Sequence, residues 1–318
     1  MKTRQLGNTG MHITSIGFGS WAVGGGGYRF GWGPQDDEQS ITAINHALDL
    51  GINWIDTAAV YGLGHAEEVV ARALKDRSDR PYVFTKCERV WNDRGEISGS
   101  LKAQSIKHEC ENSLRRLQTD VIDLYQVHWP EPEQDIEEGW RAMAELKQEG
   151  KVRHIGVSNF NVNQMRRIME IAPISSLQPP YSLVNPGIKN DILPFCQEHN
   201  IGVIVYSPMA SGLLTGSMNG ERITKLPEDD WRKRDPQFNE PRLSHNLQLV
   251  EVLNEIAFMH NVTPGVVAIA WTLQHPGVTA AIVGARRPEQ VDGIIPAAEF
   301  QMTDSENAQI EKFLKENP

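Results

Sequence analysis

The sequence has little cysteine and no long apolar run. Only three cysteines, Cys87, Cys110 and Cys196, occur in 318 residues, and they are widely spaced. Their spacing excludes a disulfide framework and a paired-cysteine zinc site, and it favours a reducing compartment. No apolar run approaches the ~20 residues that a membrane-spanning helix needs. Residues 1–7 also lack the apolar core of a signal peptide. We therefore expect a cytoplasmic protein that does not contact a membrane.

Positive charge is also in short supply. The chain carries 31 Lys and Arg against 41 Asp and Glu, a formal net charge of -10. Repulsion from phosphate groups argues against a general nucleic-acid or anionic-membrane binder. A local cationic pocket for one small anion remains compatible with this balance. Hydrophobic residues make up 40% of the chain and charged residues 23%, which is typical of a soluble globular protein.

The apolar pattern alternates between strand and helix along most of the chain. Residues 4–19 predict a small hairpin followed by a strand, and helical periodicity begins at Asp37. Eight candidate strands end near Gly19, Asp56, Lys86, His128, Ser158, Gln178, Tyr206 and Gly284. This rhythm predicts an α/β fold, a (β/α)8 TIM barrel with an N-terminal β-hairpin and a C-terminal helix. No linker or shift of composition interrupts residues 1–318, so we expect a single domain.

Two segments depart from this rhythm. The stretch at about 208–245 is polar and contains Trp and Pro, and loops of that length are usually functional lids or disordered. We expect a lid, followed by a helix over 246–260. Residues 17–22 fit the GxGxxA pattern of dinucleotide-binding folds, which requires a helix directly afterwards. Four glycines at 24–27 follow instead, so we interpret this segment as a loop at the rim of the barrel.

Four reactive side chains follow the predicted strands. Asp56, Lys86 and His128 stand at strand ends, and Tyr61 lies on the loop after Asp56. The carboxyl ends of the strands of such a barrel form the rim where its chemistry takes place. Each residue alone has an ordinary structural explanation, such as a cap, rim packing or a solvated charge. Four compatible groups at one rim favour a shared site.

These four groups suit the reduction of a carbonyl. Hydride addition leaves negative charge on the carbonyl oxygen, which must receive a proton or a strong hydrogen bond. Tyr61 is expected to supply the proton, and Lys86 to tune the acidity of the phenol. Asp56 is expected to keep Lys86 charged. His128 is expected to orient the carbonyl or relay a proton.

The motifs resemble those of the aldo-keto reductases over essentially the whole chain. The Tyr61 and His128 contexts are closer to the bacterial, plant and potassium-channel-β-subunit-like branch than to aldose reductase. The segments that carry the resemblance are residues 51–62, 84–86, 120–130, 150–160, 205–216 and 282–291. The resemblance implies an NADP-dependent oxidoreductase that acts on a small-molecule carbonyl substrate, and a monomer. It implies Asp56, Tyr61, Lys86 and His128 as the catalytic tetrad.

The same resemblance implies that NADPH (NADP+) lies extended across the rim, with Tyr206 stacked on the nicotinamide and Arg286 on the 2′-phosphate. The implied cofactor residues are Gly19, Ser20, Trp21, Asp56, Ser158, Asn159, Gln178, Tyr206, Ser207, Pro208, Met209, Ala210, Ser211, Gly212, Leu213, Gly284, Arg286 and Gln290. The chain departs from the family pattern at two places: Gly293 and Ile294 replace a Glu-Asn pair near the adenine, and Gly284-Ala285 replaces the Lys-Ser of the aldose reductase branch.

Aromatic residues near the rim offer apolar walls for a substrate. The expected substrate pocket consists of Trp21, Tyr61, Trp91, His128 and Trp129. A cofactor-sensing binding module with little turnover, like the channel β subunits, remains an alternative to the reductase. A metal-dependent hydrolase on the same fold would need clustered His and acidic ligands, which the sequence lacks. We expect no bound metal.

Overall fold

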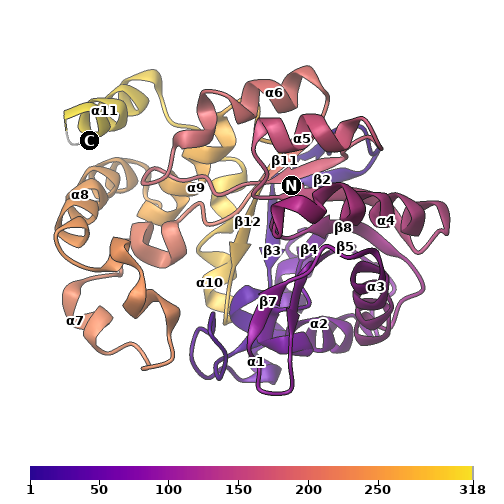
Figure 1. Cartoon of the computed structure of the whole chain (residues 1–318). Helices are drawn as coiled ribbons and strands as arrows, with labels where there is room; N and C mark the ends of the chain where they lie inside the picture. Colours follow the sequence, from indigo (N-terminus) through magenta and orange to yellow (C-terminus); the bar gives the residue numbers. More distant parts are fainter. Residues whose placement is uncertain (317–318) are drawn as a thin grey trace.

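Eight parallel strands form a closed barrel (Figure 1), which confirms the predicted (β/α)8 fold. The computed structural model describes residues 1–316, and positions 317 and 318 of the predicted domain lie outside the described residues. The barrel order is β10-β11-β12-β3-β4-β5-β8-β9. The strands are β3 Ile16–Gly19, β4 Trp54–Asp56, β5 Tyr82–Cys87, β8 Ile122–Val127, β9 Val152–Ser158, β10 Ser176–Gln178, β11 Gly202–Val205 and β12 Ala280–Gly284.

Helices surround the barrel and bury one apolar face each. In α1, for example, Ile44 and Leu48 share a face that packs into the main core. Capping boxes begin two of these helices, one at Asn161 with Gln164 and one at Thr303 with Glu306. The helices are α1 Asp37–Asp49, α2 His65–Leu74, α3 Ala103–Leu117, α4 Ile136–Gln148, α5 Val162–Met169, α6 Ile192–Glu198, α7 Gly220–Thr224, α8 Arg242–His260, α9 Pro264–Gln274, α10 Pro288–Asp292 and α11 Asp304–Glu316.

The predicted hairpin, β1 Thr3–Gln5 with β2 His12–Thr14, closes the amino-terminal end of the barrel. Its apolar residues belong to the same buried cluster as the barrel-interior side chains of Trp54 and Phe84. The Trp54 indole donates a hydrogen bond to the Thr14 carbonyl at 2.9 Å. The barrel is thus sealed at one end, and its cavity opens only toward the carboxyl ends of the strands.

The segment after β11 has more structure than predicted. Helix α8 begins at Arg242 rather than at Asn246, and four short helices precede it. These are the 3-10 turns η5 Ala210–Thr215, η6 Trp231–Arg234 and η7 Pro236–Phe238, together with α7. They pack on a small core of their own, which consists of Leu213, Met218, Ile223, Phe238 and Leu243. Polar composition hid this structure because side-chain caps at Asn219, Asp230 and Asp235 stabilise the turns.

A second hairpin, β6 Arg89–Trp91 with β7 Ile97–Gly99, stands on the rim between β5 and α3. The sequence pattern did not indicate it. Among the described residues, no single helix is long and apolar enough to cross a membrane. The bent pair α8 and α9 meets the length and composition criteria only when the two helices are taken together.

The interior of the sealed end leaves no room for an added methyl group at Gly17. A Cβ at Gly17 would lie 2.1 Å from the Trp54 ring, whereas nothing lies within 4 Å of a Cβ at the exposed Gly187. We expect Gly17→Ala to lower the free energy of unfolding by about 1–3 kcal/mol, because the core is overpacked. Gly187→Ala should change it by less than about 0.5 kcal/mol. Urea denaturation of both variants measures the difference, and equal midpoints would contradict this packing.

Candidate active site

Three of the four predicted catalytic residues form one hydrogen-bonded group at the open end of the barrel. The Lys86 ammonium donates to Asp56 Oδ1 at 2.6 Å and to the Thr57 carbonyl at 2.8 Å. It lies 3.4 Å from the Tyr61 hydroxyl. The His128 ring faces Tyr61 edge-on, with centroids 5.9 Å apart. The structure therefore brings all four side chains together.

Strand register explains this convergence. Asp56 is paired with Phe84 across β4 and β5, and Lys86 stands two residues further along the same inward face. His128 directly follows β8, and its backbone N–H donates to the Cys87 carbonyl. The turn Tyr61–Gly64 then places the phenol over the barrel mouth.

Burial shifts the pKa of every member of this group. It raises the pKa of Asp56 and lowers the pKa of Lys86, while the contact between the two charges opposes both shifts. The pKa of Tyr61 lies well above its usual value because of burial and the nearby Asp56 charge. The pKa of His128 lies well below its usual value because of burial, with smaller contributions from Lys86 and Arg89. His128 is therefore neutral near neutral pH.

The pKa of Tyr61 stays above its usual value although the Lys86 ammonium lies 3.4 Å from the hydroxyl, because burial and the Asp56 charge raise it. Asp56 lies closer to the Lys86 nitrogen than Tyr61 does and offsets the ammonium charge. The hydroxyl of Tyr61 therefore keeps its proton at neutral pH and remains a donor.

A further contact within the site was not predicted from the sequence. The Gln178 amide donates to Asp56 Oδ2 at 2.8 Å, so both oxygens of the buried carboxylate are engaged. Gln178 ends β10, on the far side of the barrel from β4 in strand order. Its position at a strand end was visible in the sequence, but its partner depended on closure of the barrel.

Three of the expected cofactor residues, Ser158, Asn159 and Tyr206, lie beside this group. Asn159 donates to the His128 carbonyl at 3.0 Å and accepts from the Tyr206 hydroxyl at 2.8 Å. Ser158 donates to the Gln178 carbonyl at 2.8 Å. These bonds fix Asn159, Ser158 and the Tyr206 ring around one end of the cavity.

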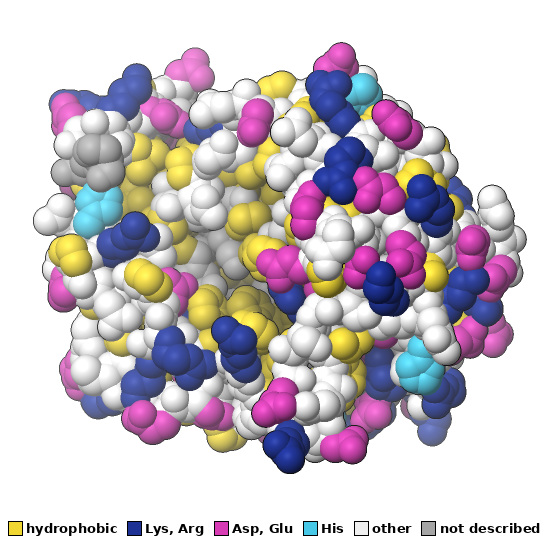
Figure 2. All heavy atoms as spheres, in the orientation of Figure 1, with side chains coloured by type: hydrophobic (Ala, Val, Ile, Leu, Met, Phe, Trp, Pro, Cys, Tyr) yellow, Lys and Arg dark blue, Asp and Glu magenta, His cyan; other side chains and the backbone are white. Residues whose placement is uncertain are grey.

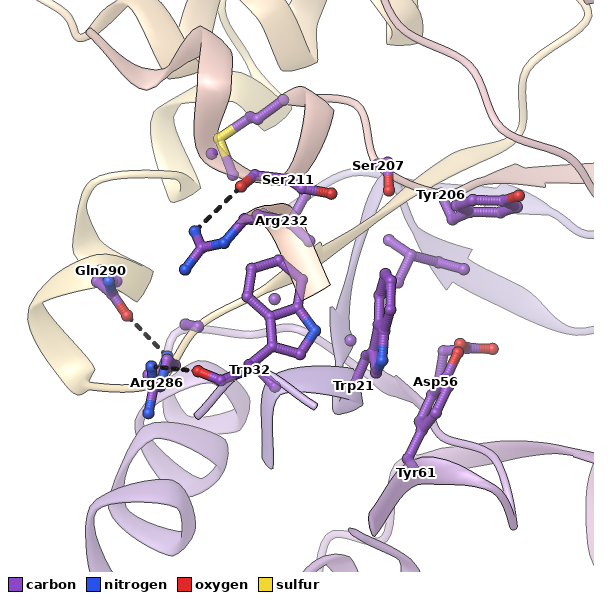
Figure 3. A pocket seen from close by; sticks show the side chains of 18 of the residues that line it. Trp21, Trp32, Asp56, Tyr61, Tyr206, Ser207, Ser211, Arg232, Arg286 and Gln290 are labelled. Atoms are coloured by element: carbon purple, nitrogen blue, oxygen red, sulfur yellow. Dashed lines mark hydrogen bonds between the residues drawn. The ribbon is translucent and has the colours of Figure 1, made fainter. Parts of the chain in front are cut away.

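A cavity of about 1270 Å³ extends from this group across the rim. It exceeds the ~300–1,000 Å³ usual for a single small ligand. In Figure 3, Asp56 and Tyr61 stand at one end and Arg286 and Gln290 at the other, with Trp21 and Trp32 between them. In Figure 2 the surface is hollowed over β12 and α10, with hydrophobic side chains inside the hollow.

Most of the predicted site residues line this cavity. Those that do are Gly19, Trp21, Asp56, Tyr61, His128, Trp129, Ser158, Asn159, Gln178, Tyr206, Ser207, Pro208, Met209, Ser211, Gly212, Gly284, Arg286 and Gln290. Lys86 and Ser20 are buried beneath the surface, and Ala210 and Leu213 do not reach the cavity.

The predicted place of Trp91 in the substrate pocket is wrong, because Trp91 is not among the lining residues. The indole lies on β6, where the Arg116 guanidinium is 5.9 Å from the ring centroid. The unpredicted hairpin carries the tryptophan away from the barrel mouth. Arg89, at the start of the same strand, lines the cavity instead.

Four arginines line the cavity at the end away from Tyr61, namely Arg222, Arg232, Arg286 and Arg287. Arg286 donates to the side chain of Gln35 and to the Trp32 carbonyl, and its own N–H donates to Gln290 at 2.7 Å. Burial lowers the pKa of Arg286, with a further contribution from the Arg232 charge. Such a cluster suits a phosphate group.

The backbone between these two ends is strained. Ser207, Ala210 and Ser211 all have φ between 47° and 55°, and Gly212 follows at 93°. Left-handed residues other than glycine are costly and collect at ligand clamps. Runs of such conformations also turn backbone N–H groups toward bound anions. The strain thus falls on a segment made of expected cofactor residues.

The lid segment 208–241 packs on the loop after β3 through aromatic rings. The Trp231 ring stacks on Trp21 with centroids 5.1 Å apart, and the Arg232 guanidinium lies 4.6 Å from the centroid of the Trp32 ring. The buried Asp230 holds Arg232 through two hydrogen bonds of 2.6 Å and 3.0 Å. Apart from two opposite charges close together in the chain, nothing in the sequence pattern indicated the Asp230–Arg232 pair.

The described residues include no cluster of three or more His, Cys, Asp or Glu side chains that would hold a metal ion. The polar groups of the cavity are hydroxyl, amide and guanidinium groups around one acid–base group. This donor set fits an extended dinucleotide with phosphates at one end.

Comparison with known proteins agrees with this geometry. The chain is 37% identical over 318 residues to an aldo-keto reductase of Bacillus subtilis, with 99% of this chain and 94% of that protein covered. It is 32% identical to an NADH-specific methylglyoxal reductase of Escherichia coli, with 96% of each chain covered.

Solved structures give the same result. A glycerol dehydrogenase from Gluconobacter oxydans superposes with a TM-score of 0.89 at 36% identity, over 99% of this chain and 96% of that one. An aldo/keto reductase from Klebsiella pneumoniae in complex with NADP and acetate superposes with a TM-score of 0.75 at 29% identity, over 99% and 96%. The model of the aldo/keto reductase family matches residues 15–315. The chain belongs to the aldo/keto reductase family.

Proposed function

We propose that this protein is an NADPH-dependent reductase of aldehydes or ketones, with Tyr61 as the proton donor. The observation that carries the proposal is the group formed by Asp56, Lys86 and Tyr61 with His128 facing the phenol. This group stands at the head of a cavity long enough for a dinucleotide and a small substrate. The structural relative that holds NADP supports the choice of cofactor.

Bound NADPH would supply a hydride to the carbonyl carbon. Tyr206, Ser158, Asn159 and Gln178 would hold the nicotinamide end, and Arg286 with Gln290 would hold the 2′-phosphate. As the carbon gains the hydride, negative charge develops on the carbonyl oxygen, and Tyr61 transfers its hydroxyl proton there. The product is an alcohol, and the tyrosinate regains its proton from solvent.

The neighbouring side chains support this proton transfer. A neutral His128 donates one ring N–H to the carbonyl oxygen and so positions it beside the Tyr61 hydroxyl. Lys86 stabilises the tyrosinate that forms, because its Nζ already lies 3.4 Å from that oxygen. Asp56 and the Thr57 carbonyl hold Lys86 in place.

We further propose that the protein uses NADPH in preference to NADH. The relative from Escherichia coli is NADH-specific, so family membership does not decide it. The four arginines at one end of the cavity favour the phosphorylated form. Gly293 and Ile294 also line this end, which leaves the adenine with fewer polar side chains and the phosphate with a larger share of the binding.

Removal of the Tyr61 hydroxyl tests the mechanism. We expect Tyr61→Phe to lower kcat by roughly a hundredfold to ten-thousandfold, because the variant lacks the hydroxyl that donates the proton to the carbonyl oxygen. NADPH absorbance decay with a panel of aldehydes measures the rate. Tyr82→Phe is the control, because it removes a tyrosine hydroxyl at the start of β5, away from the cavity, and it should retain activity. Undiminished turnover in Tyr61→Phe would refute this role.

The role of Arg286 is tested by the ratio of kcat/KM with NADPH to kcat/KM with NADH. We expect Arg286→Gln to lower this ratio by roughly tenfold to a hundredfold, because a charged hydrogen bond to the phosphate is lost. Arg286→Lys should restore part of it, since a point charge replaces the planar fork. If the ratio stayed constant in both variants, the 2′-phosphate of NADPH would not be bound by Arg286.

The pH profile of reduction tests the state of His128. Its lowered pKa moves protonation to more acidic pH, so the neutral ring persists through the region where a free histidine titrates. We expect kcat/KM to show no inflection near the ordinary ~6.5 of histidine. Rates in a constant-ionic-strength buffer series measure this. An inflection at that pH which disappears in His128→Gln would show that His128 is solvated instead.

A further inference from the structure

One arginine stands apart from the others that line the cavity. Arg222, Arg232, Arg286 and Arg287 come from the lid and the β12–α10 connection, at the end proposed for the cofactor phosphates. Arg89 comes from the start of β6, three residues after Lys86, and lines the cavity together with His128 and Trp129. Arg89, the fifth arginine of the cavity, takes no part in the proposed binding of the cofactor.

Arg89 lies directly beside the reacting groups. Its guanidinium is 5.5 Å from the centroid of the Trp129 ring, and Trp129 follows His128 in the chain. Its charge is close enough to contribute to the lowered pKa of His128. The side chain retains 19% of its surface exposed, so part of it faces the cavity and solvent.

Two carboxyl groups contact Arg89, and they differ sharply in burial. Glu131 accepts from Arg89 at 2.9 Å, and its side chain is 57% exposed. Glu88 lies 3.4 Å away and is fully buried, with its other oxygen accepting from the Trp129 N–H at 3.1 Å. Gly99 of β7 presses on this group so closely that a Cβ there would lie 2.5 Å from Glu88 Oε1.

Neither carboxyl group neutralises Arg89 firmly. Burial raises the pKa of Glu88 to about 9, although Arg89 opposes the shift, so Glu88 is mainly protonated at neutral pH. In the contact with Glu131 the carboxylate is largely exposed, so solvent screens the ion pair and weakens it. An anion that enters from the cavity can therefore replace Glu131 at little cost.

We propose that Arg89 forms an anion-binding subsite of the substrate pocket, and that the preferred substrates are aldehydes or ketones that carry a carboxylate. This inference rests on the proposed reductase function. The planar fork of Arg89 matches a carboxylate, while Trp129, whose ring lies under Arg89, and Trp21 both line the cavity and provide apolar walls for the carbon chain between the two ends of the substrate. The protein as a whole has a net charge of -10, so a preference for anions requires such a local cation.

Matched acid and ester substrates test the subsite. Succinate semialdehyde and para-carboxybenzaldehyde are each compared with their own methyl ester, which keeps the carbonyl and chain but removes the charge. We define the acid preference as kcat/KM for the acid divided by kcat/KM for its ester, and use the pair with the larger value. We expect the parent enzyme to prefer the acid, and Arg89→Gln to lower the preference by roughly tenfold to a hundredfold.

Two further variants make the test specific. Arg94→Gln removes the same charge from an exposed site on the same hairpin, away from the cavity, and should leave the acid preference unchanged. Glu131→Gln removes the internal competitor for Arg89 and should raise the preference, which also decides the matter if Arg89→Gln fails to fold.

The outcomes separate the two proposals. The subsite would be overturned if the parent enzyme reduced the esters as well as the acids. It would also be overturned if Arg89→Gln and Glu131→Gln both left the acid preference unchanged. In either case the reductase function would stand. If the protein reduced none of the four substrates and no member of a wider panel of neutral aldehydes, the reductase function itself would be overturned.

Discussion

The contact between Lys86 and Asp56 is the constraint on which the site depends. Both side chains are almost completely buried, and their charged atoms lie 2.6 Å apart. Either charge alone would be strongly destabilised at this position, so each requires the other. The pair exists only because β4 and β5 run in register, with the contacting rings of Trp54 and Phe84 in the barrel beneath it. The sealed end of the barrel thus supports the chemistry at the open end.

Much of this centre could be predicted because it follows from local sequence. Asp56, Lys86 and His128 each stand at the end of an apolar run, and a parallel barrel brings strand ends to one rim whatever the details of packing. The contacts between distant elements could not be predicted in this way. Gln178 reaches Asp56 only after the barrel closes, and the contact of Lys86 with the Tyr61 hydroxyl likewise depends on how the loop after β4 folds back over the barrel mouth.

The rim was predictable only in outline. A polar composition between β11 and α8 indicated a lid, but its short helices depend on a core made from apolar residues scattered over thirty positions. Trp91 and Arg89 show the same limit. Both lie on β6 of a short hairpin that the sequence pattern did not indicate, and only Arg89, at the end of β6 that follows β5, lines the cavity. The aromatic residue was the more obvious candidate from the sequence, whereas the structure favours the arginine.

The distribution of charge along the cavity gives the site a direction. Four arginines at one end suit the phosphates that we propose bind there, and buried groups that are neutral or paired occupy the middle, where the proposed reaction develops charge. A carboxylate on the substrate would be repelled by Asp56 if the substrate could bind in any orientation. With Arg89 placed beyond His128, the anion is drawn away from Asp56, and the carbonyl at the other end of the same molecule is left against Tyr61. One cation therefore influences both which substrate binds and which way round it lies.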